Sequence, residues 1–344
     1  MKWIVGYPCR PRAGYIDRVI ELKDEIKEIF FSFGNMPNGR STFVEEGETE
    51  LDKMMRQLDD LKRTKNAGIK HNLLLNAACY GKDSQSRSFF CGIGDTVDML
   101  ISKVGVSSVT TSSPLIARFI KSNFDTLDVR ASVNMEIGSI EGISYVEDIF
   151  DSFYIKRELN RNIRALKECK EYLDSKGKSM YLLANSGCLS NCSAHTFHDN
   201  LVAHESEISA MDNGYQFTGV CRDYVTKPGN EYAWLERTTF IRPEDVELYE
   251  GFTDAMKLAT RVNESPLRVL NAYAGRKYRG SVMELLEPDH SGLIFPRYID
   301  NALIPSEHTE RMMRCDKRCY ACGKCREVSK AATVVLEDYL TMKV

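Results

Sequence analysis

Hydrophobic positions along the chain form short strand-like runs that alternate with longer amphipathic stretches. The runs rich in β-branched and aromatic residues predict strands at 2–8, 28–33, 70–76, 107–111, 128–134, 152–158, 180–186 and 255–261. Between them, apolar residues recur at helical spacing over 14–28, 48–66, 94–105, 113–123 and 159–178. This alternation of strands with helices is typical of a parallel α/β fold.

Eight strands that are each followed by a helix favour a closed TIM-type (β/α)8 barrel over an open sheet. No Gly-x-Gly-x-x-Gly follows a predicted strand, which argues against a dinucleotide-binding sheet. We expect the barrel at 1–280, with an insertion after the seventh strand at about 188–238, and a cysteine-rich C-terminal extension at 281–344. The loops that follow the strands' carboxyl ends should carry the function.

Composition narrows the class of protein. Of the 344 residues, 43% are hydrophobic, which is enough to supply a full core. The formal net charge of -3 gives no bulk basic surface, so a small or mixed substrate is favoured and nucleic acid would need a local patch. No segment reaches about 18 consecutive apolar residues and no signal peptide is evident, so we expect a cytoplasmic protein without a membrane span.

The eleven cysteines favour thiolate chemistry in a reducing compartment over a disulfide framework, because their number is odd and no secretion signal accompanies them. Cys221 lies in the insertion and could fold over the barrel mouth, whereas Cys169 falls on the apolar side of a predicted helix and should be a core residue. The remaining cysteines outside the terminal group follow predicted strands and are expected on one face of the barrel: Cys9, Cys79, Cys91, Cys188 and Cys192.

The loop after the seventh predicted strand, NSGCLSNCSAHTFHDN, pairs Cys188 and Cys192 with histidines close behind. Zinc would take two thiolates and two imidazoles, whereas an iron-sulfur cluster would take the thiolates and recruit further cysteines. Two loop thiols without a metal are the plain alternative. For a thiol protease, Cys192 with His195 is the close candidate pair, and HTFHDN lacks the His-Glu-x-x-His of a metalloprotease.

A second group of cysteines stands at 315–325, CDKRCYACGKC. Cys315, Cys319 and Cys322 have the Cys-x3-Cys-x2-Cys spacing of radical-SAM enzymes. The motif follows the last predicted strand rather than the first, however, and the aromatic Tyr320 stands one residue too early. The fourth thiol, Cys325, makes this a closed site.

A closed four-thiolate site can hold zinc or a [4Fe-4S] cluster. The compact spacing favours a cluster, since zinc ribbons separate their two cysteine pairs by a dozen or more residues. Basic residues interleave the thiols and would offset the negative charge of a cluster: Lys317, Arg318, Lys324 and Arg326.

Two segments resemble peptidase family U32 (collagenase-like), and together they cover roughly 152–278. In the first, an Arg-Glu dipeptide closes one strand and a glycine-cysteine element follows the next; the second holds an Arg-Pro-Glu-Asp turn before a strand and a helix. The segments are FYIKRELNRNIRALKECKEYLDSKGKSMYLLANSGCLSNCS and TTFIRPEDVELYEGFTDAMKLATRVNESPLRVLNAYAGRKY.

The resemblance implies a TIM-type barrel whose relatives bind a [4Fe-4S] cluster through four cysteines at the barrel mouth. Those relatives support oxygen-independent hydroxylation of a quinone precursor or of RNA bases. Carried over by position, Cys188 and Cys192 match the family's paired thiols and Cys221 its downstream one. The fourth ligand has no clear match, and the terminal group could supply it.

Charged side chains also gather near the predicted strand ends. Arg157, Lys257 and Arg261 could clamp a carboxylate or phosphate, and Glu136 and Glu158 would then be general acid or base candidates. A salt bridge at the barrel rim is the alternative for Arg157 and Glu158, which as strand neighbours would point to opposite faces. Further charged residues expected on this face are Arg40, Arg242 and Glu244.

We therefore expect an iron-sulfur-dependent oxidoreductase or hydroxylase of the U32 type, with one or two [4Fe-4S] clusters. Its substrate would be a small molecule or derived from RNA, and an electron donor protein is a candidate partner. Two alternatives stay open: a zinc-stapled barrel that acts as a peptidase or binding module, and an atypical radical-SAM enzyme.

Overall fold

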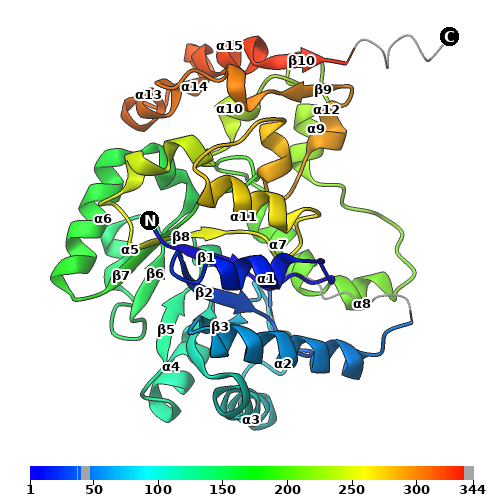
Figure 1. Ribbon diagram of the computed structural model, residues 1–344, viewed down its shortest axis with the longest axis vertical. Helices are drawn as coiled ribbons and strands as arrows, with labels where there is room; N and C mark the ends of the chain where they lie inside the picture. The colour runs from blue at the N-terminus through cyan, green and yellow to red at the C-terminus, as the bar shows by residue number, and fades with distance from the viewer. Residues whose placement is uncertain (37, 40–46, 337–344) are drawn as a thin grey trace.

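Eight parallel strands in sequence order close into a barrel, which confirms the predicted TIM-type (β/α)8 architecture (Figure 1). The structure is a computed structural model and describes residues 1–36, 38–39 and 47–336. Pairing of β8 with β1 closes the barrel. The strands are β1 (Trp3–Gly6), β2 (Ile26–Phe31), β3 (Lys70–Leu75), β4 (Val106–Thr111), β5 (Asp128–Ala131), β6 (Ser152–Tyr154), β7 (Ser179–Leu183) and β8 (Ala255–Leu258).

Helices pack around the outside of the barrel. Thr49 forms a capping box with Asp52 at the start of α2 (Glu50–Asn66). Burial on α6 (Ile163–Ser175) raises the pKa of the Cys169 thiol to about 11, as expected of a core cysteine. The helices that follow the strands are α1 (Tyr15–Glu21), α2 (Glu50–Asn66), α3 (Arg87–Val104), α4 (Pro114–Asn123), α5 (Ile140–Ser144), α6 (Ile163–Ser175) and α11 (Pro266–Ala274).

Side chains alternate between the two faces of each strand. Ile29 of β2 and Leu73 of β3 join the large core between the strands and the helices. Phe30, Leu74 and Tyr154 belong to a separate cluster inside the barrel. This alternation lets one strand serve both cores.

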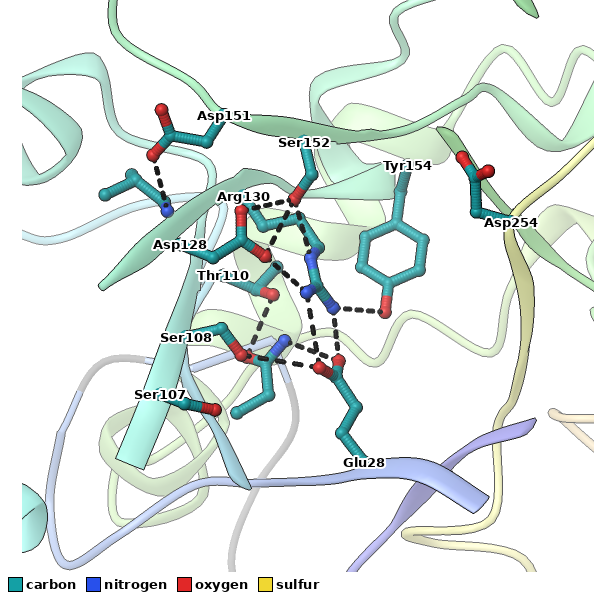
Figure 2. Close-up of polar contacts among 12 residues, drawn as sticks. Glu28, Ser107, Ser108, Thr110, Asp128, Arg130, Asp151, Ser152, Tyr154 and Asp254 are labelled. Atoms are coloured by element: carbon teal, nitrogen blue, oxygen red, sulfur yellow. Dashed lines mark hydrogen bonds and ion pairs between the residues drawn. The ribbon is translucent and has the colours of Figure 1, made fainter. Parts of the chain in front are cut away.

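One layer of the barrel interior is polar (Figure 2). Arg130 on β5 donates both to Glu28 on β2 and, at 2.9 Å, to the Ser152 hydroxyl on β6. Its guanidinium carbon lies 4.4 Å from the centre of the Tyr181 ring. Because Glu28 precedes Phe30 in β2, the polar layer lies deeper in the barrel than the apolar one that faces the strands' carboxyl ends.

The insertion and the C-terminal extension build a second core together, at one end of the molecule (Figure 1). In it, Trp234 and Leu235 of the insertion pack with Val282, Leu286 and Ile304 of the extension. Residues on both sides of the boundary predicted near 280 thus share one core, and that boundary stays a prediction. The elements here are α7 (His195–Ala203), α8 (Glu205–Ser209), α9 (Val220–Val225), α10 (Trp234–Arg237), η4 (Val282–Leu285), α12 (Ser291–Ile294), β9 (Arg297–Ile299), η5 (Asn301–Leu303), α13 (His308–Arg314), α14 (Cys319–Cys322), α15 (Lys324–Ala331) and β10 (Thr333–Val335).

Several predicted elements have different bounds in the structure. The helix predicted over 14–28 ends at Glu21, and β2 begins at Ile26. Two strands end early and continue as short 3-10 helices, η1 (Val133–Met135) after β5 and η2 (Arg157–Arg161) after β6. Another 3-10 helix, η3 (Pro243–Tyr249), precedes β8. Within the described residues, no helix combines the length and the apolar character needed to span a membrane.

Candidate functional site

A pocket of about 420 Å³ opens at the carboxyl ends of the strands, and we call it the mouth pocket. Its volume falls in the range typical of small-molecule sites. Apolar side chains such as Phe30 and Leu74 line it together with Cys188. Several cationic side chains also line it: Arg10, Arg12, Arg157, Lys257 and Arg261. Carboxylates join them from Asp199, Glu205, Glu264 and Glu287.

The structure thus brings together the three predicted clamp residues Arg157, Lys257 and Arg261. Lys257 is 7% exposed, and its ammonium lies 4.2 Å from the centre of the Phe30 ring and 4.8 Å from that of Tyr154. Cation–π contacts of this kind hold a charge over an apolar floor. Whether these residues clamp a substrate stays a prediction.

Arg157 is anchored by side chains that the sequence did not connect with it. Its Nη2 donates to Glu136 Oε1 at 3.2 Å and lies 2.8 Å from His195 Nε2. His195 in turn lies 3.3 Å from Asp199 Oδ2. Burial lowers the pKa of Arg157, but its anionic neighbours, Cys188 first, raise the pKa by more, so the net shift is upward.

Glu136 and Glu158 lie outside the lining of the mouth pocket. Glu136 contacts Arg157, and Glu158 accepts a hydrogen bond at 2.8 Å from the backbone N–H of Asn191, between the two loop cysteines. The expectation that Arg157 and Glu158 lie in a strand and point to opposite faces was wrong, because β6 ends at Tyr154 and both belong to η2. The acid or base role of the two glutamates stays a prediction.

Of the three cysteines predicted to bind a cofactor, Cys188 lines the mouth pocket, and Cys192 and Cys221 lie outside that lining. Burial raises the pKa of Cys221, and the negative charge of Cys188 and Cys192 raises it further. The same Cys188 charge acts on Arg157. A thiol beside a fixed cation, with two further thiols near enough to interact electrostatically, is a donor set that suits an anionic iron-sulfur cluster.

The terminal cysteines face a buried arginine that the sequence analysis did not identify, Arg161 of η2. Burial lowers the pKa of Arg161, and among the charges that oppose this shift are those of Cys325, Cys319 and Cys315. Its guanidinium donates to the backbone carbonyls of Leu235 and Glu236, at 2.6 Å and 3.0 Å. Its Nε has no hydrogen-bond acceptor among the described residues, although it is buried. A buried cation with an orphaned N–H fits a site for a thiolate-bound, anionic centre.

As placed, however, the side chains of the described residues form no group of three or more histidine, cysteine or acidic residues ready to hold a metal ion. The terminal thiols also keep other partners: Lys317 Nζ donates to Cys315 Sγ at 3.3 Å. Metal binding at either group would therefore require the cysteine side chains to turn toward a common centre. The metal assignments of Cys315, Cys319, Cys322 and Cys325 stay predictions.

The other cysteines expected at the mouth divide into three cases. Cys9 lines the mouth pocket. Cys79 lines a neighbouring pocket instead. Placing Cys91 on the barrel face was wrong, because α3 already begins at Arg87 and Cys91 lies exposed on this helix.

The pairing of Cys192 with His195 is a backbone contact, in which the His195 N–H donates to the Cys192 carbonyl at 3.1 Å.

Two charged residues expected at the mouth lie elsewhere. Arg242 forms a bidentate ion pair with Asp245 (2.6 Å and 2.9 Å) and donates to the Ile304 carbonyl at 3.2 Å. Glu244 accepts from Asn301 at 2.8 Å. Both residues therefore bind the extension to the barrel. Arg40 lies outside the described residues.

The chain was compared with known proteins by sequence and by fold. No protein-family model matches the chain. The chain is 28% identical over 330 residues to the uncharacterised protease MJ1657 of Methanocaldococcus jannaschii, an alignment that covers 92% of this chain and 91% of that protein. The solved structure of the U32 peptidase Mk0906 shares the fold, with a TM-score of 0.52 and 16% identity, over 75% of this chain and 91% of that one. These similarities bear out the resemblance noted in the sequence: the chain is similar to an uncharacterised protease along most of its length and shares its TIM-barrel fold with a U32 peptidase.

Proposed function

We propose that this protein is an iron-sulfur enzyme of the U32 type that carries out oxygen-independent oxidoreductase or hydroxylase chemistry in its mouth pocket. Cys188, Cys192 and Cys221 would hold a [4Fe-4S] cluster there. The terminal cysteines would hold a second centre. The substrate would be a small anionic molecule or a base derived from RNA.

One observation carries this proposal: each cysteine group lies beside a buried arginine, and both arginines come from η2. Arg157 interacts with Cys188, and Arg161 with Cys315, Cys319 and Cys325. A buried guanidinium is stable only next to negative charge. Arg157 already has the Glu136 carboxylate beside it, whereas Arg161 forms no ion pair with a carboxylate among the described residues. Thiols that stayed protonated would leave Arg161 without a counter-charge, so this arginine favours thiolates bound to a metal centre at the terminal group.

The pocket residues support binding of a small anion. Arg157 is held in place by Glu136 and His195, so it presents a fixed guanidinium to the pocket. Lys257 adds an ammonium above the apolar floor. A bound cluster would supply one-electron transfer at this mouth. The chain itself would bind and orient the substrate.

Metal and sulfide analysis of protein purified without oxygen tests the proposal, together with electron paramagnetic resonance after reduction. We expect iron and acid-labile sulfide in equal amounts, about four irons per cluster. Cys188→Ala should remove the signal of the mouth cluster, and Cys319→Ala that of the terminal one. Cys91→Ala is the matched control, because that thiol is exposed on α3 and should leave both signals intact.

Arg161→Met tests the role of η2 directly. It should lower the metal content of the terminal group and leave the mouth group loaded, because Arg161 interacts with the terminal thiols. One zinc ion per site, without acid-labile sulfide, in the wild-type protein would contradict the iron-sulfur proposal. It would then favour the zinc-stapled barrel.

A further inference from the structure

A second pocket, of about 620 Å³, lies beside the mouth pocket and is here called the side pocket. Cys79, in the loop after β3, lines it. His204, at the junction of α7 and α8, and Glu207 of α8 line the same pocket. The iron-sulfur proposal uses none of these three residues.

The three side chains lie next to one another in this pocket. The His204 imidazole interacts with the Cys79 thiol, and both line the side pocket. On its other side, His204 Nδ1 lies 2.8 Å from Glu207 Oε2. With Nδ1 engaged by the carboxylate, Nε2 is the ring nitrogen left for the thiol. This is the order of a nucleophile, a base and a residue that orients the base.

The loop also presents backbone donors to the sulfur. The backbone N–H groups of Gly81 and Tyr80 favour the anionic form of Cys79, and Gly81 has a φ of 70°, in the left-handed region that glycine adopts easily. The Tyr80 hydroxyl fixes the loop by donating to the Leu75 carbonyl at 2.7 Å. The sulfur is therefore held in place before any substrate arrives.

The electrostatic surroundings of this thiol differ from those of three buried or partly buried cysteines, Cys169, Cys221 and Cys325. The His204 imidazole, followed by the Gly81 N–H, lowers the pKa of Cys79. The Cys79 and Glu207 contacts raise the pKa of His204 in turn. Burial instead raises the pKa of Cys169, Cys221 and Cys325. Other charged groups that line the same pocket are Lys82, Asp83 and Glu205.

We propose that Cys79, His204 and Glu207 form a second catalytic site, in which Cys79 is the nucleophile for acyl transfer from an ester or amide bound in the side pocket. The Cys79 sulfur bonds to the acyl carbon, the bond to the leaving group breaks, and His204 gives the thiol's proton to that group. Water then attacks the thioester and loses a proton to His204. The acid leaves and the free thiol is regenerated.

p-Nitrophenyl acetate is a direct probe of this site, read by nitrophenol release and by peptide mass spectrometry. We expect acetylation of the peptide that contains Cys79, and release of more than one equivalent of nitrophenol per chain. Cys79→Ser should abolish both. Cys91→Ser, which replaces another accessible thiol, should change neither.

His204→Gln separates catalysis from simple exposure of the thiol. We expect acetylation of Cys79 at neutral pH to slow by about a hundredfold, the usual effect of losing a general base. The pH at which the rate is half-maximal should rise toward that of an ordinary thiol, and Glu207→Gln should move both in the same direction. Equal acetylation of Cys79 and Cys91, or an unchanged rate in His204→Gln, would overturn the proposal.

Discussion

The guanidinium of Arg130 is held inside the barrel by groups from several strands. It bonds to Glu28 on β2 and lies 2.5 Å from Asp128 Oδ2, and both Arg130 and Glu28 are 2% exposed. A charge this far from water is tolerated only where opposite charge and hydrogen bonds replace its hydration. The pair therefore ties β2 to β5 beneath the mouth pocket.

Replacing Glu28 by glutamine tests how much this buried ion pair contributes to the free energy of unfolding. Glu28→Gln keeps the shape of the side chain but removes the charge that faces Arg130, so we expect a loss of about 3 kcal/mol in the free energy of unfolding. Urea denaturation measures it. Arg164→Gln, which breaks an exposed ion pair with Glu168 on α6, should have little effect. Equal denaturation midpoints for Glu28→Gln and the wild type would contradict this expectation.

Among the elements, the 3-10 helix η2 lies between the mouth pocket and the terminal cysteine group and faces both. Arg157, at its start, faces the mouth pocket, and Arg161, at its end, faces the terminal cysteines. Asn160 between them is fully buried and donates to the carbonyls of Leu183 and Thr239, at 2.9 Å and 3.0 Å. One side chain thus fixes the segment that carries both arginines.

Asn160→Ala should therefore disturb more than stability. We expect the free energy of unfolding to fall by about 2 kcal/mol, because two buried carbonyls lose their donor. If the cysteine groups bind metal, the metal content should fall at both, since both arginines shift. Asn123→Ala is the control, because Asn123 makes one exposed bond to the Phe119 carbonyl within the same turn of chain. Full metal content in Asn160→Ala would show that η2 does not need this anchor.

The elements also show what the sequence could reveal. The eight strands were predictable because each carries enough buried apolar residues to show as a run, and their order fixed the barrel. The ends of β5 and β6 were not, since DVRASVN and SFYIKRE keep a strand-like pattern beyond the last ladder bond. The 3-10 helix that follows β6 is held by contacts from Asn160 to residues distant in the chain, which the local sequence pattern does not reveal.

Some features of the candidate site could be predicted from the sequence and others could not. The cysteine groups could be predicted because their members are close in the sequence. The contact of Cys79 with His204 and that of Arg161 with the terminal thiols could not, since each joins segments that only the folded barrel brings together. Local spacing carries no signal for such pairs.

At the scale of the whole molecule, a buried clamp joins the extension to the barrel. Arg242 and Asp245 of the η3 region are each 5% exposed, and Arg242 also donates to the carbonyls of Ile304 and Pro305. Thr309 of α13 donates to Asp245 at 2.5 Å. The terminal cysteines follow α13 directly, so the clamp also sets their position.

Arg242→Met should loosen this end of the molecule first. It leaves the buried Asp245 carboxylate without its cation, a change that costs about 3 kcal/mol or more. Limited trypsin digestion should then cut within 281–336 earlier than in the wild type, with the barrel still intact. Arg314→Met removes a basic residue from an exposed pair with Glu310 and serves as the control. An unchanged order of cleavage would mean that the second core holds the extension without the clamp.

Acid should destabilise the protein through histidines buried in both cores. Burial lowers the pKa of His71 in the barrel and of His290 and His308 in the second core, that of His308 to about 4. An unfolded imidazole binds its proton near pH 6.5, so between about pH 6.5 and 4 the unfolded chain takes up protons that the folded chain does not. Stability must therefore fall as the pH falls through this window, by about 3 kcal/mol for His308 alone.

Urea denaturation at pH 7.5 and at pH 4.5 measures this loss, which His308→Gln should reduce because glutamine does not titrate. His204→Gln is the control, since the Cys79 and Glu207 contacts raise the pKa of His204 and its contribution has the opposite sign. Protease sensitivity can show which of the two cores responds to acid first. If His290 and His308 dominate, the extension should become sensitive to protease at a higher pH than that at which the barrel unfolds. Equal loss of stability in His308→Gln and the wild type would instead assign the acid sensitivity to the other buried histidines, His290 and His71, the latter of which bonds to the Val104 carbonyl at 2.7 Å.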